Sequence, residues 1–174
     1  MKRECALTVA VAAFATALAA APAPAQVGVA ANPAIDMQQF LRLSAEAAVA
    51  RETRRVSEDE FIRLSRDPAT IVLDARSRDR FDLMHVRGAM NLSFPDIAVE
   101  SLHRLIPDVN TRILIYCNNN FTGADDAFPT KLPATSLNLS TYVALYAYGY
   151  RNVYELAPTV DVRRSKLVFD AAKR

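Results

Sequence analysis

The sequence predicts an α/β fold in which a parallel sheet carries helices on both of its faces. Short apolar runs at 71–73, 112–116 and 153–156 are typical of buried strands. Helical patterns at 95–105 and 136–148 separate them. Strands that alternate with helices in this way indicate parallel strands joined by crossover helices.

Length and composition restrict the possible functions. The chain has 174 residues, which is enough for one domain, and 51% of them are hydrophobic, which is enough for a core. A net charge of +2 creates no basic field for nucleic acid or an acidic membrane. Four glycines do not form a glycine-rich phosphate loop, and two cysteines and two histidines show no zinc-ligand spacing. We therefore expect no nucleic-acid partner, no metal and no cofactor.

The N-terminus has the pattern of a secretory signal. Lys2 and Arg3 give a basic start, an apolar stretch follows at 5–20, and small residues lead up to Ala25. This pattern predicts a signal peptide over 1–25 that is removed after Ala25. We expect export, to the periplasm, and no membrane attachment after cleavage. An uncleaved N-terminal anchor is the alternative.

Cleavage would remove Cys5 and leave Cys117 as the only cysteine of the mature chain. A lone cysteine cannot form a disulfide within its chain, although disulfides are the usual reason for cysteine in exported proteins. Cys117 is therefore either a buried, inert thiol or a functional group. It directly follows the strand 112–116, as Asp74 follows the strand 71–73. Because ligands of parallel sheets bind at the carboxyl ends of strands, this position favours a functional cysteine.

The segment before the first strand predicts a linker and a helix. The helix covers 36–52 and has Phe40, Leu43 and Ala47 on one apolar stripe. Arg54 and Arg55 follow and predict a solvated turn.

Capping signals indicate where two further helices begin. Ser57 and Glu60 have the spacing of a capping box for a helix at 58–65. Ser136 is expected to cap the helix at 136–148. The weaker patterns predict helical turns at 77–83, a strand at 89–92, a helix at 95–105, a loop at 118–135 and either a helix or an extended tail at 160–174.

Three segments resemble the rhodanese-like domain family. IVLDARSRDRFDLMHVRGAMNL (71–92) is similar to the family's strand, Asp-x-Arg pair and Gly-His-Ile-x-Gly-Ala-x-Asn element. RILIYC (112–117) is similar to the strand that ends in the nucleophilic cysteine, and LYAYGYRNVYEL (145–156) to the last helix and closing strand. The resemblance implies one domain with a central parallel sheet of about five strands and helices on both faces. The implied segments are a linker and helix at 26–55, the rhodanese-like domain at 56–157 and a tail at 158–174.

The loop after Cys117 departs from the family pattern. The family has an arginine a few residues after the cysteine, whereas here none occurs before Arg151. Lys131 is the only cation in between, and Asp125 and Asp126 add negative charge. The chain therefore resembles an extended-loop variant, for which we expect thiosulfate to be a poor substrate. The missing guanidinium also argues against a phosphatase, which needs one to hold the phosphate oxygens.

The resemblance implies a sulfurtransferase that moves sulfane sulfur through a persulfide on Cys117. Its partners would be a small sulfur donor and a thiol or another sulfur acceptor. By the same resemblance, Asp74 and Arg76 support the site rather than react. A Cys–His pair with His85 is disfavoured, because no third group is available to orient it.

The loop residues next to the cysteine are the candidates for contact with sulfur. Asn118, Asn119 and Asn120 suit a loop that curls round a sulfur atom, because asparagine tolerates left-handed backbone and donates hydrogen bonds. Lys131 is expected to hold an anionic donor. A plain polar turn is the alternative for the three asparagines.

A non-catalytic rhodanese-like module is the alternative function. In that case the long loop would recognise a protein partner, and Cys117 would sense sulfur or redox state. We favour the sulfurtransferase. The two are distinguished by whether Cys117 takes up sulfur and passes it on.

Overall fold

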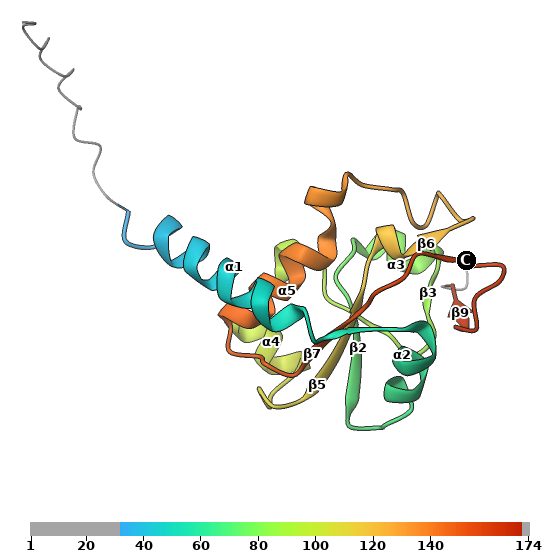
Figure 1. Cartoon of the computed structure of the whole chain (residues 1–174), viewed down its shortest axis with the longest axis horizontal. Helices are drawn as coiled ribbons and strands as arrows, with labels where there is room; N and C mark the ends of the chain where they lie inside the picture. The colour runs from blue at the N-terminus through green and yellow to red at the C-terminus, as the bar shows by residue number, and fades with distance from the viewer. Residues whose placement is uncertain (1–31, 172–174) are drawn as a thin grey trace, which may run out of the picture. The chain divides into compact units, whose positions relative to one another are not determined.

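Five parallel strands form the central sheet of the computed structural model, which describes residues 32–171 (Figure 1). The strands are β1 (Arg55–Val56), β2 (Thr70–Asp74), β4 (Met90–Asn91), β5 (Arg112–Tyr116) and β7 (Val153–Leu156). Their order across the sheet is β1-β7-β5-β2-β4, and every neighbouring pair is parallel. The predicted α/β class and the sheet of about five parallel strands are confirmed.

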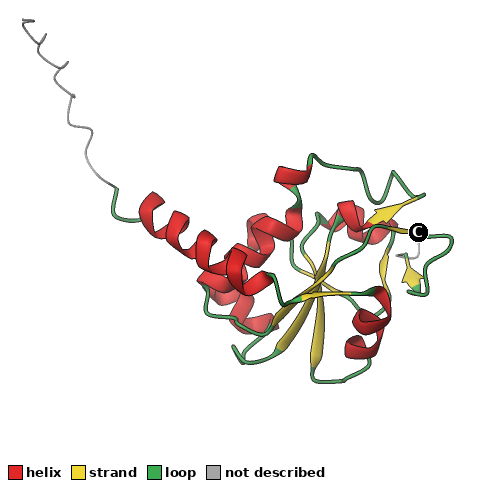
Figure 2. Ribbon diagram, in the orientation of Figure 1, coloured by secondary structure: helices red, strands yellow, loops and turns green. Residues whose placement is uncertain are grey.

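Helices cover both faces of this sheet (Figure 2). They are α1 (Met37–Arg51), α2 (Glu58–Ser65), α3 (Arg78–Leu83), α4 (Val99–Leu105) and α5 (Leu137–Ala147). Ile113 and Ile115 of β5 point into one core cluster, which also holds buried residues of α1, α4 and α5. Leu114 and Tyr116 point to the opposite face and pack with α2. This alternation follows from the strand geometry, in which successive side chains point to opposite faces.

The N-terminal helix α1 forms where it was predicted. Asp36 caps it, since its carboxylate accepts a hydrogen bond from the backbone N–H of Gln39 at 2.8 Å. Of the predicted apolar stripe, Ala47 is buried but Phe40 remains 55% exposed. The reason is that α1 packs mainly against α5, and Figure 1 shows the first turns of α1 projecting beyond it.

The prediction of a solvated turn at Arg54 and Arg55 is wrong. Arg55 begins β1, which pairs with Glu155 and Leu156 of β7. The guanidinium of Arg54 lies 4.7 Å from the centre of the Tyr154 ring. Both arginines therefore attach the edge strand to the sheet.

One capping box and one helix start differ from the sequence prediction. Ser57 caps α2, because its hydroxyl accepts from the backbone N–H of Glu60 at 3.2 Å. The Glu60 carboxylate binds Arg63 instead of turning back, so only half of the capping box forms. The helix predicted from 95 begins at Val99, because the residues before it form a separate 3₁₀ turn, η1 (Phe94–Asp96).

The long loop and the end of the chain pair with other segments instead of remaining irregular. Within the loop, β6 (Phe121–Thr122) pairs in parallel with β8 (Val160–Asp161). Further along, β9 (Phe169–Asp170) pairs antiparallel with β3 (His85–Val86). Residues 160–170 thus form no helix and contain two short strands, and the sequence patterns of these two-residue strands were too short to indicate them.

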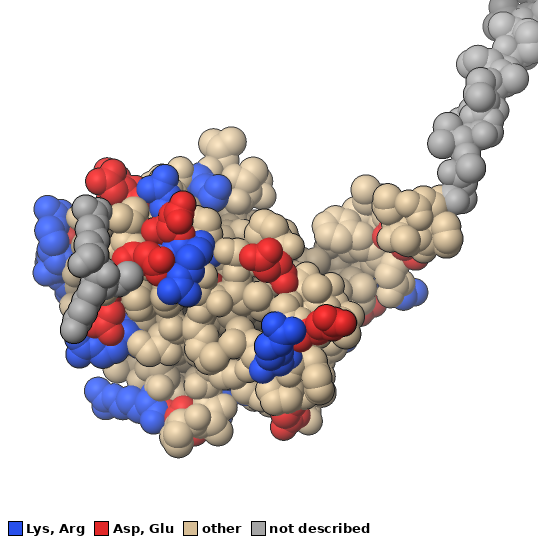
Figure 3. All heavy atoms as spheres, turned by 180° about the vertical axis from the view of Figure 1, so that it is seen from behind, with Lys and Arg blue, Asp and Glu red and all other residues tan. Residues whose placement is uncertain are grey.

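The surface carries mixed charge in the view of Figure 3, where acidic and basic side chains lie interspersed rather than gathered by sign. No helix within residues 32–171 is long and apolar enough to cross a membrane. The predicted signal peptide at 1–25 lies outside the described residues.

Candidate functional site

Cys117 lies between the carboxyl end of β5 and the start of α5. It directly follows Tyr116, and its side chain is 1% exposed. Its Sγ lies 3.3 Å from the hydroxyl of Ser136, which immediately precedes α5. The fold therefore places the sulfur at a helix N-terminus, where unpaired backbone N–H groups favour negative charge.

Asn120 fixes the turn that follows the cysteine. Its Oδ1 accepts from the backbone N–H of Cys117 and from Nδ2 of Asn138, each at 2.9 Å. Its Nδ2 donates to the Leu156 carbonyl at 2.7 Å. The turn itself is the 3₁₀ helix η2 (Asn118–Asn120). Because its amide is bonded to the protein at both ends, Asn120 shapes the loop, which is one of the roles predicted for the three asparagines.

Asn119 closes the loop across twelve residues. Its Nδ2 donates to the Lys131 carbonyl at 2.9 Å, and its Oδ1 accepts from the Lys131 N–H at 3.0 Å. Residues 131–135, which follow, are all exposed and lead directly to Ser136. The Asn119 side-chain amide therefore fixes the start of the segment 131–135, which leads to Ser136.

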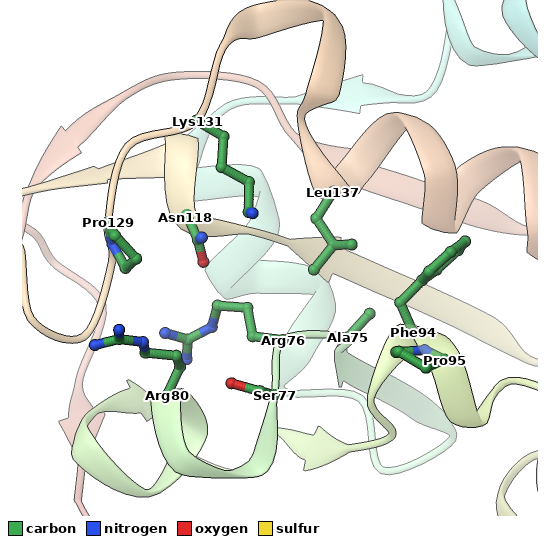
Figure 4. Close-up of a pocket in the computed structure, with 10 residues that line it drawn as sticks. All are labelled: Ala75, Arg76, Ser77, Arg80, Phe94, Pro95, Asn118, Pro129, Lys131 and Leu137. Atoms are coloured by element: carbon green, nitrogen blue, oxygen red, sulfur yellow. The ribbon is translucent and has the colours of Figure 1, made fainter.

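Two separate hollows adjoin this loop. The cysteine hollow has a volume of about 190 Å³. It is lined by Cys117, Asn119, Asn120, Ser136, Asn138, Arg51, Glu155, Pro133, Leu139 and Ala157. The lysine hollow, shown in Figure 4, has a volume of about 380 Å³. It is lined by Lys131, Asn118, Arg76, Ser77, Arg80, Ala75, Phe94, Pro95, Pro129 and Leu137. Lys131 and Asn118 thus lie in a different hollow from Cys117, although all three belong to one loop.

The cation of the cysteine hollow is Arg51 at the end of α1. Its Nε and Nη2 both bind the carboxylate of Glu155, with Nη2 at 2.7 Å from Oε1. This hydrogen bonding raises the pKa of Arg51, which keeps the guanidinium charged. The sequence around Cys117 does not indicate Arg51, because Arg51 lies far before the cysteine in the chain. The signal was Glu155 in an apolar strand, because a buried carboxylate requires a cationic partner.

Asp74 and Arg76 form a buried ion pair beneath the loop. Their side chains are 0% and 1% exposed, and Arg76 Nη2 lies 2.5 Å from Asp74 Oδ2. Tyr116 donates its hydroxyl to the same carboxylate at 2.6 Å. Burial and the neighbouring Asp74 charge raise the pKa of Tyr116 well above its usual value, so the phenol stays protonated and can donate. Arg76 Nη1 donates to the Ala127 carbonyl at 2.8 Å, which links the pair to the long loop.

His85 lies in neither hollow. Its ring stacks on Phe81 with the ring centres 3.7 Å apart, and its Nδ1 lies 2.8 Å from the Phe81 carbonyl oxygen. Across the part of the chain that the structure describes, no three His, Cys, Asp or Glu residues are grouped closely enough to hold a metal ion.

The predicted side-chain cap of α5 is wrong. Ser136 occupies the N-cap position, but its hydroxyl makes no hydrogen bond to the helix and faces Cys117 instead. The Ser136 hydroxyl could bind either a backbone N–H of α5 or the Cys117 sulfur, and it contacts the sulfur.

We therefore expect Ser136→Ala to have little effect on stability. Its free energy of unfolding should fall by less than half of the ~1 kcal/mol that a lost cap costs. Ser57→Ala is the matched control, because Ser57 does cap its helix, and it should show the full cost of ~1 kcal/mol. Urea unfolding midpoints of both variants measure the difference. Equal losses would mean that Ser136 caps α5 after all.

Opening the loop at Asn119 should expose the cysteine. Asn119→Ala removes both hydrogen bonds to Lys131, and each such bond stabilises by about 0.5–1.5 kcal/mol. We expect alkylation of Cys117 by iodoacetamide to become about five- to tenfold faster. Peptide mass spectrometry at Cys117 gives the rate. Asn110→Ala, whose side chain binds only the nearby Asp108, should leave it unchanged, and so should Asn119→Ala if the segment is held by other contacts.

The fold and the buried cysteine at a strand end define a class of α/β domains built around one thiol. Residues 57–157, more than half of the chain, match the rhodanese-like domain model. The chain therefore belongs to the rhodanese-like domain family. No curated protein sequence matches it.

Solved structures with a similar fold include three sulfur-related proteins. A rhodanese with anions from E. coli is 20% identical, with a TM-score of 0.40, over 59% of this chain and 98% of that one. A thiosulfate sulfurtransferase from Pseudomonas aeruginosa is 17% identical, with a TM-score of 0.43, over 70% and 21% of the chains. A polysulfide-sulfur transferase homodimer from Wolinella succinogenes is 16% identical, with a TM-score of 0.37, over 75% and 96%. Likenesses this distant carry no information on substrate or activity.

Proposed function

We propose that this protein is a sulfurtransferase that carries sulfane sulfur as a persulfide on Cys117. The observation that carries the proposal is the position of the Cys117 sulfur, at the carboxyl end of β5 and 3.3 Å from Ser136 at the start of α5. A thiolate is the nucleophilic form of cysteine, and helix N-termini and hydroxyl donors stabilise it. Membership of the rhodanese-like family supports the same chemistry.

The reaction consists of two displacements at sulfur. The Cys117 thiolate attacks the sulfane sulfur of a donor, so that a bond from Sγ to that sulfur forms and the donor's own bond to it breaks. The rest of the donor leaves as an anion with the electron pair of the broken bond. An acceptor thiolate then attacks the outer sulfur of the persulfide, which restores the Cys117 thiolate. Ser136 donates its hydroxyl hydrogen to Sγ whenever the sulfur is anionic.

Donor choice follows from the size and charge of the cysteine hollow. Its volume of about 190 Å³ is below that of typical sites for organic ligands, which span about 300–1,000 Å³. The charge of Arg51 is offset by Glu155, so the lining offers no free cation to bind the sulfonate oxygens of thiosulfate, a group that persulfides and polysulfides lack. Small persulfides and polysulfides are therefore the favoured donors, and thiosulfate is a poor one.

Intact-mass measurement tests this function directly. The wild-type protein, reduced and freed of donor, should gain the mass of one sulfur atom with polysulfide and little or none with thiosulfate. Addition of a thiol acceptor should then remove the added sulfur. No gain with thiosulfate, mercaptopyruvate, glutathione persulfide or polysulfide would overturn the proposal. The low exposure of Cys117 would then favour the alternative, a rhodanese-like module that binds a partner without catalysis.

The same proposal includes export to the periplasm with removal of residues 1–25. It rests on the basic start, the apolar stretch and the small residues before Gln26. N-terminal sequencing of protein purified from the cell envelope should begin at Gln26. A mature chain that still begins at Met1 would contradict export by cleavage.

A further inference from the structure

The lysine hollow has a polar side and an apolar side. Figure 4 shows the ammonium of Lys131 and the amide of Asn118 directed into the space above Arg76, while the hydroxyl of Ser77 lies below Arg76. Leu137 and Phe94 line the opposite side. With a volume of about 380 Å³, the hollow has the size of a small-molecule site.

The positive charges of Lys131 and Arg80 have no carboxylate partner among the described residues, but only the ammonium of Lys131 is directed into this hollow. The charge of Arg76 is offset by its buried pair with Asp74. Arg80 turns its guanidinium outward, where it donates to the Asp126 carbonyl. The ammonium of Lys131 forms no ion pair within residues 32–171, and no carboxylate belongs to the lining. The charge therefore matches a ligand with a single negative charge.

The Asn118 side chain adds a requirement for a hydrogen-bond donor. Asn118 is 4% exposed, and its buried Oδ1 has no hydrogen-bond partner among the described residues. A buried carbonyl oxygen without a hydrogen-bond partner destabilises the protein, because its interaction with water is lost and not replaced. A ligand hydroxyl that donates to Oδ1 would remove this destabilisation.

We propose that the lysine hollow binds a small aliphatic 2-hydroxycarboxylate. The carboxylate contacts Lys131, the hydroxyl donates to Asn118, and the aliphatic part packs on Leu137 and Phe94. The site does not depend on sulfur transfer, because Cys117 lines the other hollow.

Titration of the ¹⁵N-labelled full chain, followed by NMR, tests the site with 2-hydroxy-4-methylpentanoate as the probe. The Asn118 side-chain amide and the backbone amides of Lys131 and Leu137 should shift together. Two comparison compounds each lack one group: 4-methylpentanoate lacks the hydroxyl, and 4-methylpentane-1,2-diol lacks the carboxylate. Each should bind about tenfold more weakly, the effect of losing one hydrogen bond in a polar site.

Matched variants distinguish binding in this hollow from nonspecific attraction of an anion to the protein surface. Lys131→Met keeps the length of the side chain and removes its charge, and it should weaken probe binding about tenfold. Arg104→Met removes an exposed cation outside the hollow and should leave binding unchanged. Cys117→Ser should bind the probe as the wild type does, even where sulfur uptake is lost. Absence of shifts at Asn118, equal weakening by both charge variants, or equal binding of the three compounds would overturn the proposal.

Discussion

Replacement of Cys117 by serine should abolish sulfur uptake completely. Serine keeps the shape of the side chain and the contact with Ser136, but its hydroxyl does not ionise near neutral pH and forms no persulfide. With polysulfide, intact-mass spectra of Cys117→Ser should show no added sulfur, while the wild type gains one sulfur atom. Because the two side chains are nearly isosteric, the variant should unfold at a urea concentration close to that of the wild type.

Two variants make this result specific. Cys5→Ser in the full chain should take up sulfur as the wild type does, which excludes the other cysteine as the carrier. Lys131→Ala should retain uptake, because Lys131 faces the lysine hollow and not the sulfur. Uptake that persists in Cys117→Ser would place the sulfur elsewhere and contradict the assignment.

Removal of the Arg76 charge should cause the largest loss of stability in the molecule. Arg76→Met leaves Asp74, which is 0% exposed, without its cation and without the three hydrogen bonds that the guanidinium donates to the carboxylate. Breaking a buried ion pair by removing one partner costs about 3–5 kcal/mol. The link from Arg76 to the Ala127 carbonyl is lost as well. Urea unfolding followed by circular dichroism measures the change.

The exposed pair of Arg87 and Asp170 provides the control. Arg87→Met removes the same type of side chain from a solvated pair, which contributes little to stability. Its unfolding midpoint should stay close to that of the wild type. If Arg76→Met and Arg87→Met had similar midpoints, the buried pair would not be a principal support of the loop.

The strands of the sheet could be predicted because their signal is local. The run at 113–116 is apolar throughout, and a buried parallel strand requires this on both faces. Cys117 and Asp74 were placed at the same edge of the sheet because parallel strands end together. The structure bears out this placement, since Asp74 lies opposite Tyr116, the residue before Cys117.

The partners of these residues could not be predicted, because they come from distant parts of the chain. Arg51 reaches Glu155 across 104 residues, and no local pattern encodes such a pairing. The hydroxyl of Ser136 had two partners within reach, the helix and the sulfur, and the sequence indicates only the first. Lys131 was predicted to act beside Cys117 because of its place in the loop. The Asn119 side chain binds the Lys131 backbone, however, and Lys131 lines the other hollow.

The loop after Cys117 pairs with residues 158–161, which are synthesised after the central sheet. Asn120 donates to the carbonyls of Leu156 and Pro158, Thr159 donates to Asn119, and β6 depends on β8. During synthesis from the N-terminus, all five strands of the central sheet emerge from the ribosome before β8 and β9. The loop after Cys117 therefore gains these partners only after the strands of the central sheet have been synthesised. A nascent chain can possess its sheet and its cysteine while the loop next to the sulfur still lacks the contacts that hold it to β8.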